Sequence, residues 1–179
     1  MAEIATSNQK LKLRLEKHSP STLKLILSSN DDAVNNEIVI QPQGILRVYE
    51  VIIGLRLKEY LKSGELHLTI ENRYDERIRF FLSNNNFVYY APISVFKEIY
   101  KRKVKELDNL IMIDGHLTAM YKNKEIILIT GHKKLNVDLN KLKGTLIDHM
   151  FFKKGFKIGG IYLDQKACMR LYAFIDMLI

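Results

Sequence analysis

Apolar and polar residues alternate in short runs along most of this chain, which is the pattern of half-buried β-strands. Residues 10–16, for example, place three leucines on one face and basic side chains on the other. Strands are expected at residues 10–16, 22–28, 37–41, 66–70, 77–82, 87–90, 110–113, 134–139, 145–152 and 160–163, with a hairpin over 117–130.

Helical spacing interrupts this alternation in three places. The apolar residues of Ile45 to Lys62 predict a long helix that Ser63-Gly64 ends, because glycine is favoured just beyond a helix C-terminus. Pro92 predicts the start of a second helix, since the first helical turn does not need the missing N–H. The last helix is expected to begin at Asp164, a good N-cap residue.

Each helix follows directly on a short apolar strand, so the chain reads as an internal repeat of strands followed by a helix. The repeat units are expected at about residues 10–62, 64–107 and 109–179, and the first two could pair as one larger half. We therefore predict an α+β fold with the helices on one side of antiparallel sheet. Residues 1–9 are expected to form a disordered tail, and 10–179 a single domain.

The formal net charge of +8 favours a polyanionic partner, because long-range attraction steers such a ligand to a basic surface. The single cysteine, Cys168, excludes an internal disulfide and is interpreted as a small core residue. No signal-peptide pattern and no run of about 20 apolar residues is present. We expect a soluble, intracellular protein that does not enter a membrane.

The segment from Leu142 to Asp164 combines aromatic and basic residues around a glycine-containing turn. Single-stranded nucleic acids are held by bases stacked on aromatic rings and by cations along the phosphates. A basic hairpin is therefore predicted here as a binding surface. Its candidate residues are Phe151, Phe152, Lys153, Lys154, Phe156 and Lys157. The alternative is that the phenylalanines belong to the core and the lysines keep the turn hydrated.

Further cations flank this hairpin in sequence or share a strand with an aromatic residue. The flanking candidates are Lys133, Lys134, Lys141 and Lys143. Arg77 and Arg79 share a strand face with Phe81 and could form a second surface, or simply a hydrated sheet face. The basic residues 101–105 are explained by the dipole of the helix that they end.

The sequence offers little for catalysis. The five histidines are scattered singly, no cysteine and histidine cluster has the spacing of zinc ligands, and no phosphate-binding loop is present. Asp148 and His149, adjacent on an expected strand, would point to opposite faces. We expect a protein that is not an enzyme and that needs no cofactor or metal.

The closing region also resembles a known family. Lys143-Gly144-Thr145-Leu146-Ile147-Asp148, the basic turn and Gly160-Ile161-Tyr162-Leu163-Asp164 are similar to the core of the positive cofactor four transcriptional coactivators. The resemblance covers about residues 127–179, and the repeated joint between strand and helix, more weakly over 64–107, resembles the related Whirly proteins. Both families bind single-stranded DNA, or RNA in some relatives, on antiparallel sheets. The resemblance implies that Lys133, Lys134, Lys143, Phe151, Lys153 and Lys154 lie on or beside such a sheet.

The leading hypothesis is therefore a protein that binds single-stranded DNA or RNA in transcription or replication, as a possible homo-oligomer or with the transcription machinery. The alternative is an assembly subunit whose apolar helices dock a partner, in which Tyr172 and Phe174 would carry the contact.

Overall fold

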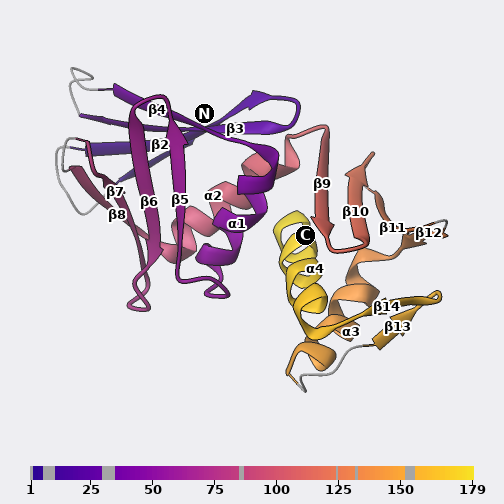
Figure 1. The fold of residues 1–179 in the computed structure, drawn as a ribbon. Helices are drawn as coiled ribbons and strands as arrows, with labels where there is room; N and C mark the ends of the chain where they lie inside the picture. Colours follow the sequence, from indigo (N-terminus) through magenta and orange to yellow (C-terminus); the bar gives the residue numbers. More distant parts are fainter. Residues whose placement is uncertain are drawn as a thin grey trace. The chain divides into compact units, whose positions relative to one another are not determined.

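The order of the elements repeats in the computed structural model of the chain, which describes residues 2–5, 11–29, 35–84, 87–123, 125–131, 133–151 and 156–179. These residues form antiparallel sheets and helices, so the predicted α+β class is confirmed. Within them, a run of four antiparallel strands is followed by a helix three times (Figure 1).

The first repeat comprises β1 Ala2–Ala5, β2 Leu11–Ser19, β3 Thr22–Ser29, β4 Asn35–Ile40 and α1 Pro42–Ile52. The second comprises β5 Lys58–Ser63, β6 Leu66–Asn72, β7 Arg77–Leu82, β8 Phe87–Pro92 and α2 Ile93–Lys105. The third comprises β9 Asn109–Asp114, β10 Leu117–Lys122, β11 Glu125–Thr130, β12 Lys133–Val137 and α3 Leu139–Phe151. A short hairpin, β13 Phe156–Ile158 and β14 Ile161–Leu163, and the helix α4 Gln165–Leu178 follow. In each four-stranded sheet, strands that are consecutive in sequence are neighbours.

The chain divides into two compact units, Met1–Leu107 and Asp108–Ile179. The first unit holds the first two repeats, whose helices α1 and α2 contact each other. Helix α1 packs on β3, β5 and β6, while α2 packs on β1, β2, β7 and β8, so each helix contacts both sheets of the unit. The helices thereby cover one face of each sheet, and on β5–β8 the opposite face is turned to solvent.

Aromatic side chains join the helices of the first unit to its second sheet. The rings of Phe80 on β7 and Phe96 on α2 meet edge to face with centroids 5.1 Å apart. The Tyr100 hydroxyl donates a hydrogen bond of 2.5 Å to the carbonyl oxygen of Ile45, which ties α2 to α1. Phe80, Phe96 and Tyr100 are fully buried, so this cluster fixes where the sheet lies on the helices.

Two ion pairs attach α4 to the rest of the second unit. Lys143 Nζ on α3 lies 2.7 Å from Asp176 Oδ1 on α4, and Arg170 Nη1 lies 3.1 Å from Asp114 Oδ1 at the end of β9. Cys168 is buried, as expected, and burial raises the pKa of its thiol to about 11. The predicted N-cap of α4 is confirmed, because Asp164 Oδ1 accepts a 2.8 Å hydrogen bond from the Ala167 amide.

The predicted helix from Ile45 to Lys62 is wrong in its second half. Helix α1 ends at Ile52, and β5 begins at Lys58. Gly54 has φ of 81°, a left-handed conformation that ends the helix, and the amides of Leu55 and Arg56 turn back to the Glu50 carbonyl oxygen. The pair Ser63-Gly64, predicted as the helix end, lies instead at the turn between β5 and β6.

The predicted strand at 145–152 is also wrong, because residues up to Phe151 belong to α3. Two features of residues 138–146 are typical of a helix. Asp138 Oδ1 accepts a 3.0 Å hydrogen bond from the Lys141 amide at the start of the helix, as a capping residue does. Leu142 and Leu146 are four residues apart and both are buried, which is helical spacing.

The N-terminal residues expected to be disordered include Ala2–Ala5, which form β1 and pair with β2. Among the described residues, no helix is long and apolar enough to cross a membrane.

Candidate nucleic-acid interface

The solvent-facing side of the sheet β5–β8 gathers aromatic and basic side chains from three of its four strands. The pairing places residues of neighbouring strands opposite each other in rows across the sheet. One row runs through Tyr60, Thr69, Phe81 and Val88, and the next through Lys58, Glu71, Arg79 and Tyr90. Because side chains alternate along a strand, Lys62 and Arg77 project from the same side. We call Lys58, Tyr60, Lys62, Arg77, Arg79, Phe81 and Tyr90 the β5–β8 face.

Each ring of this face has a cation over it. Arg77 Cζ lies 4.7 Å from the centre of the Tyr90 ring, and Arg79 Cζ lies 5.0 Å from the centre of the Phe81 ring. Lys58 Nζ lies 5.7 Å from the centre of the Tyr60 ring, which is 63% exposed. These distances are within the range of cation–π attraction, so rings and charges are interleaved.

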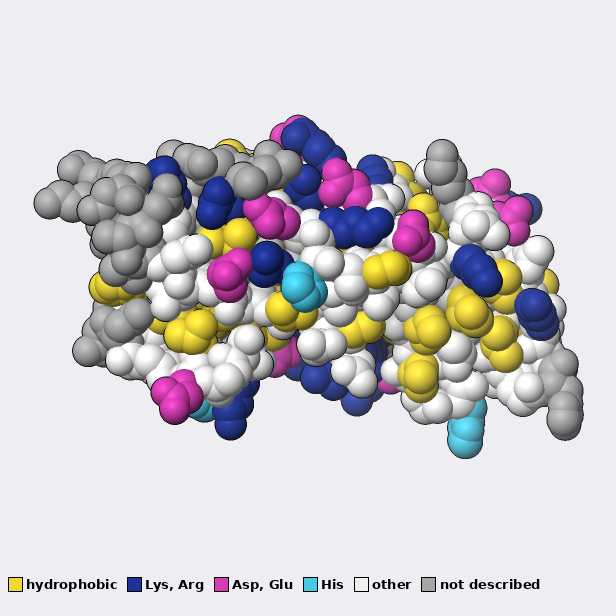
Figure 2. Space-filling model, turned by 90° about the horizontal axis from the view of Figure 1, so that it is seen from above, with side chains coloured by type: hydrophobic (Ala, Val, Ile, Leu, Met, Phe, Trp, Pro, Cys, Tyr) yellow, Lys and Arg dark blue, Asp and Glu magenta, His cyan; other side chains and the backbone are white. Residues whose placement is uncertain are grey.

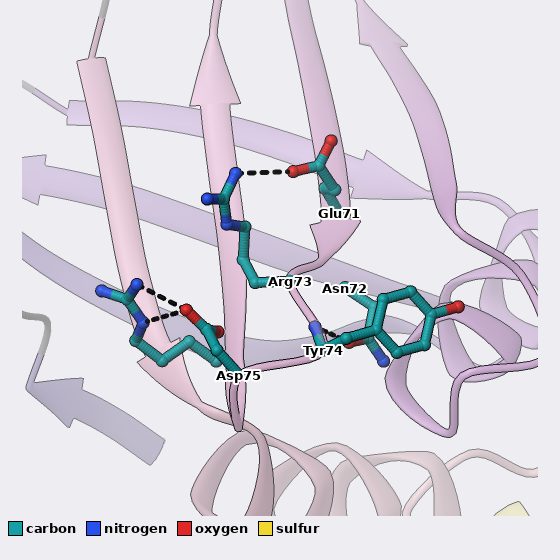
Figure 3. Close-up of polar contacts among 6 residues, drawn as sticks. Glu71, Asn72, Arg73, Tyr74 and Asp75 are labelled. Carbon is teal, nitrogen blue, oxygen red and sulfur yellow. Dashed lines mark hydrogen bonds and ion pairs between the residues drawn. The ribbon is translucent and has the colours of Figure 1, made fainter.

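The loop between β6 and β7 holds one end of the face in place (Figure 3). Asn72 is buried, and its amide group donates a 2.9 Å hydrogen bond to the Val51 carbonyl oxygen while its oxygen accepts one of 2.8 Å from the Tyr74 amide. Tyr74 has φ of 57°, a left-handed conformation that this hydrogen bond supports. The loop is therefore anchored to the end of α1.

Two carboxylates of this region pair with arginines. Arg77 donates from Nε and Nη2 to Asp75 Oδ2, at 3.1 and 2.6 Å, and Arg73 Nη1 donates to Glu71 at 3.2 Å (Figure 3). The hydrogen bonds from Arg77 lower the pKa of Asp75, and the same contact raises the pKa of Arg77. Both groups are therefore charged at neutral pH. Glu71 is the only acidic side chain that β5–β8 turn outward, so the face has a net positive charge.

The structure thus places Arg77 and Arg79, which the sequence predicted as a second surface, together with Phe81 on one sheet face. Sequence reasoning missed Lys58, Tyr60 and Lys62, because they were assigned to a helix. The signal was present in the alternation of residues 58–63, whose exposed and less exposed positions follow each other as in a strand.

The cations predicted in the second unit are spread over several elements. Lys134 and Lys157 are exposed on β12 and β13, and Lys133 Nζ donates a 3.2 Å hydrogen bond to the Gly160 carbonyl oxygen. Lys143 is half-buried in its ion pair with α4. Lys141 lines a cavity of about 410 Å³ with Leu142, Thr145 and residues of β12.

The predicted basic hairpin is only partly visible. Phe151 is the last residue of α3, and Phe156 is the first residue of β13, so they belong to different elements. Phe152, Lys153 and Lys154 lie outside the described residues. The turn that the structure does show, between β13 and β14, is formed by Gly159 and Gly160 and carries no aromatic residue.

The two other four-stranded sheets turn different chemistry to solvent. On β2–β4 the outward residues include opposite charges, with Lys24 Nζ 3.0 Å from Glu37 Oε1. On β9–β11 they are mainly aliphatic, with Ile111 46% and Ile113 66% exposed, and Met120 and Ile127 continue the row of Ile111 across the sheet. Figure 2 shows a group of hydrophobic side chains on the surface of the second unit. Among the described parts of the four-stranded sheets, only β5–β8 combine aromatic rings with several cations on the side away from the helices.

Within the part of the chain that the structure describes, no group of histidine, cysteine and acidic side chains could hold a metal ion. No family model matches the sequence, and no curated protein and no solved structure matches it. The candidate interface therefore rests on its own geometry.

Proposed function

We propose that the protein binds single-stranded DNA or RNA on the β5–β8 face, as part of transcription or replication. The observation that carries the proposal is the interleaving of Tyr60, Phe81 and Tyr90 with four cations on one exposed sheet face. Flat rings receive unstacked bases, while cations beside them attract the phosphates. A duplex hides its base faces in its own stack and would gain only the charge contribution.

The spacing of the rings fits a flexible strand that crosses the sheet. Neighbouring β-strands are about 4.8 Å apart, so Tyr60 on β5 and Phe81 on β7, in one row, are roughly 10 Å apart across the sheet. An unpaired strand can bend to place separate bases on such rings, whereas a rigid duplex cannot. The geometry favours single strands over duplexes.

The direct experiment is a titration of the protein with labelled single-stranded and double-stranded oligonucleotides, followed by fluorescence anisotropy over a salt series. We expect tighter binding to the single strand. If Lys58, Lys62 and Arg79 each neutralise a phosphate while Arg77 stays paired with Asp75, log Kd should change with log salt with a slope of about 2 in magnitude, because each contact releases about 0.7 of a counterion.

Tyr60→Ala tests the stacking contribution separately from charge. Its ring is largely exposed, so the substitution should leave the fold intact and weaken single-strand binding by about 5-fold or more, as the loss of about 1 kcal/mol or more of stacking requires. Tyr162→Ala, which removes a ring that is 62% exposed on β14, is the matched control and should leave affinity unchanged. Equal affinity for single strands and duplexes, or an affinity that salt does not change, would contradict the proposal.

The alternative of an assembly subunit stays a prediction, but the structure changes where its contact surface would lie. Phe174 is 1% exposed and Tyr172 is half-buried, and α4 packs on α3, β9 and β14 of its own unit. Exposed aliphatic side chains lie instead on β9, at Ile111 and Ile113.

A further inference from the structure

Two of the three rings on the β5–β8 face are covered by arginine side chains. The guanidinium carbon of Arg77 lies over the Tyr90 ring at 4.7 Å, and that of Arg79 lies over the Phe81 ring at 5.0 Å. A base that approaches either ring from that side meets the guanidinium group before it meets the ring. The guanidinium group is flat and delocalised, so a base can stack on it as on an aromatic side chain.

Asp75 holds the first of these guanidinium groups in a defined orientation. Both Nε and Nη2 of Arg77 donate to the same carboxylate oxygen, at 3.1 and 2.6 Å, so rotation of the group would break a hydrogen bond (Figure 3). The cation–π contact of Arg77 with the Tyr90 ring is a second restraint on the guanidinium group. These two contacts orient the guanidinium plane of Arg77 over the Tyr90 ring.

Arg79 has different surroundings. It lies directly opposite Glu71 and Tyr90 in the sheet, but Glu71 pairs with Arg73. Among the described residues, no carboxylate lies within ion-pair distance of Arg79. Its N–H groups are therefore available to a phosphate or to the edge of a base while its plane rests on Phe81.

We infer that bases of a bound single strand stack on the guanidinium planes of Arg77 and Arg79, each backed by an aromatic ring. This inference rests on the proposed function and specifies how the same face holds its ligand. If the inference is correct, binding requires arginine at positions 77 and 79, because a positive charge alone does not provide a plane for stacking. Lysine has the same charge but offers no plane, and its ammonium group is a compact point charge.

The experiment compares Arg77→Lys and Arg79→Lys with Arg102→Lys, a matched control on α2, all in the full chain. Each substitution keeps the charge, so the salt dependence of binding should stay as in the native protein. We expect each arginine-to-lysine variant to bind a single-stranded oligonucleotide about 5-fold to 100-fold more weakly, the range of a lost stacking contact. Arg102→Lys, which makes the same change at an exposed arginine outside the β5–β8 face, should bind as the native protein does.

A second readout separates base stacking from any change in folding. An oligonucleotide with abasic sites keeps its phosphates and lacks the bases that would stack. The native protein should prefer the complete strand to the abasic strand, and this preference should shrink in Arg77→Lys and Arg79→Lys. A loss of folding would weaken binding to both strands alike, and circular dichroism would reveal it.

The outcomes distinguish the inference from the function on which it rests. If the native protein prefers single strands and both lysine variants keep its affinity and its preference for complete strands, the stacking inference is overturned and the proposed function stands. If the native protein binds no single strand, the proposed function itself fails.

Discussion

At the scale of single residues, two buried tyrosines of the first unit have hydroxyl groups in opposite situations. Tyr100 and Tyr89 are both fully buried, but only the Tyr100 hydroxyl donates a hydrogen bond, to Ile45. The Tyr89 hydroxyl has no hydrogen-bond partner among the residues that the structure describes. Burial raises the pKa of Tyr89 to about 12 and that of Tyr100 well above its usual value. Both phenols are therefore neutral at physiological pH, and they differ in the hydrogen bond that Tyr100 donates.

This contrast predicts opposite effects of removing the two hydroxyl groups. Tyr100→Phe should lower the free energy of unfolding by about 1 kcal/mol, the usual net contribution of a hydrogen bond. Tyr89→Phe should leave it unchanged or raise it by about 1 kcal/mol, because a buried hydroxyl without a partner is destabilising. Urea unfolding followed by circular dichroism measures both. A larger loss from Tyr89→Phe than from Tyr100→Phe would show that the Tyr89 hydroxyl does have a partner.

At the scale of elements, alternation in the sequence predicted most strands, and capping residues predicted where α2 and α4 begin. Two of the errors, at 53–62 and 145–152, have one physical origin. Short apolar runs fit both periods, and the choice depends on burial against distant residues. Leu142 and Leu146 are buried in the second unit, and residues 58–63 pair with β6, which local pattern alone does not reveal. For the same reason the candidate site was only partly predicted. Arg77 and Arg79 were found on their own strand, but Lys58 and Tyr60 come from one that was taken for a helix.

Two glycines test these element boundaries. Gly144 lies within α3, with no atom near the position of an added Cβ, so Gly144→Ala should raise the stability of the second unit by about 0.5–1 kcal/mol. Gly54 has φ of 81°, so Gly54→Ala should lower the stability of the first unit by about 1–2 kcal/mol. Thermal unfolding monitored by circular dichroism compares both with the native chain. Destabilisation by Gly144→Ala would count against a helix at this position.

At the scale of the whole molecule, three repeats of one topology have acquired different solvent faces. The inner face of each sheet packs on helices, and for this reason all three inner faces carry similar buried leucines and isoleucines. Their outer faces are free to differ, and they carry paired charges on β2–β4, rings with cations on β5–β8, and aliphatic side chains on β9–β11. Net charge alone could not locate the site, because basic residues occur in both units.

The division into two units makes the location of the site testable by truncation. Residues 1–107 contain both sheets, α1 and α2, and the aromatic cluster that joins them, so this chain should fold alone with a cooperative unfolding transition. It retains the whole β5–β8 face, and we expect its affinity for a single-stranded oligonucleotide to lie within about 3-fold of that of the full chain, a difference below about 1 kcal/mol. The full chain with Lys133, Lys134 and Lys157 changed to alanine is the matched control, because it removes three cations of the second unit and should leave its fold intact, since all three side chains are exposed. Near-native binding by both would locate the interface on the first unit. If both bind much more weakly than the native chain while their unfolding transitions remain cooperative, the cations of the second unit hold the ligand, as the sequence first suggested.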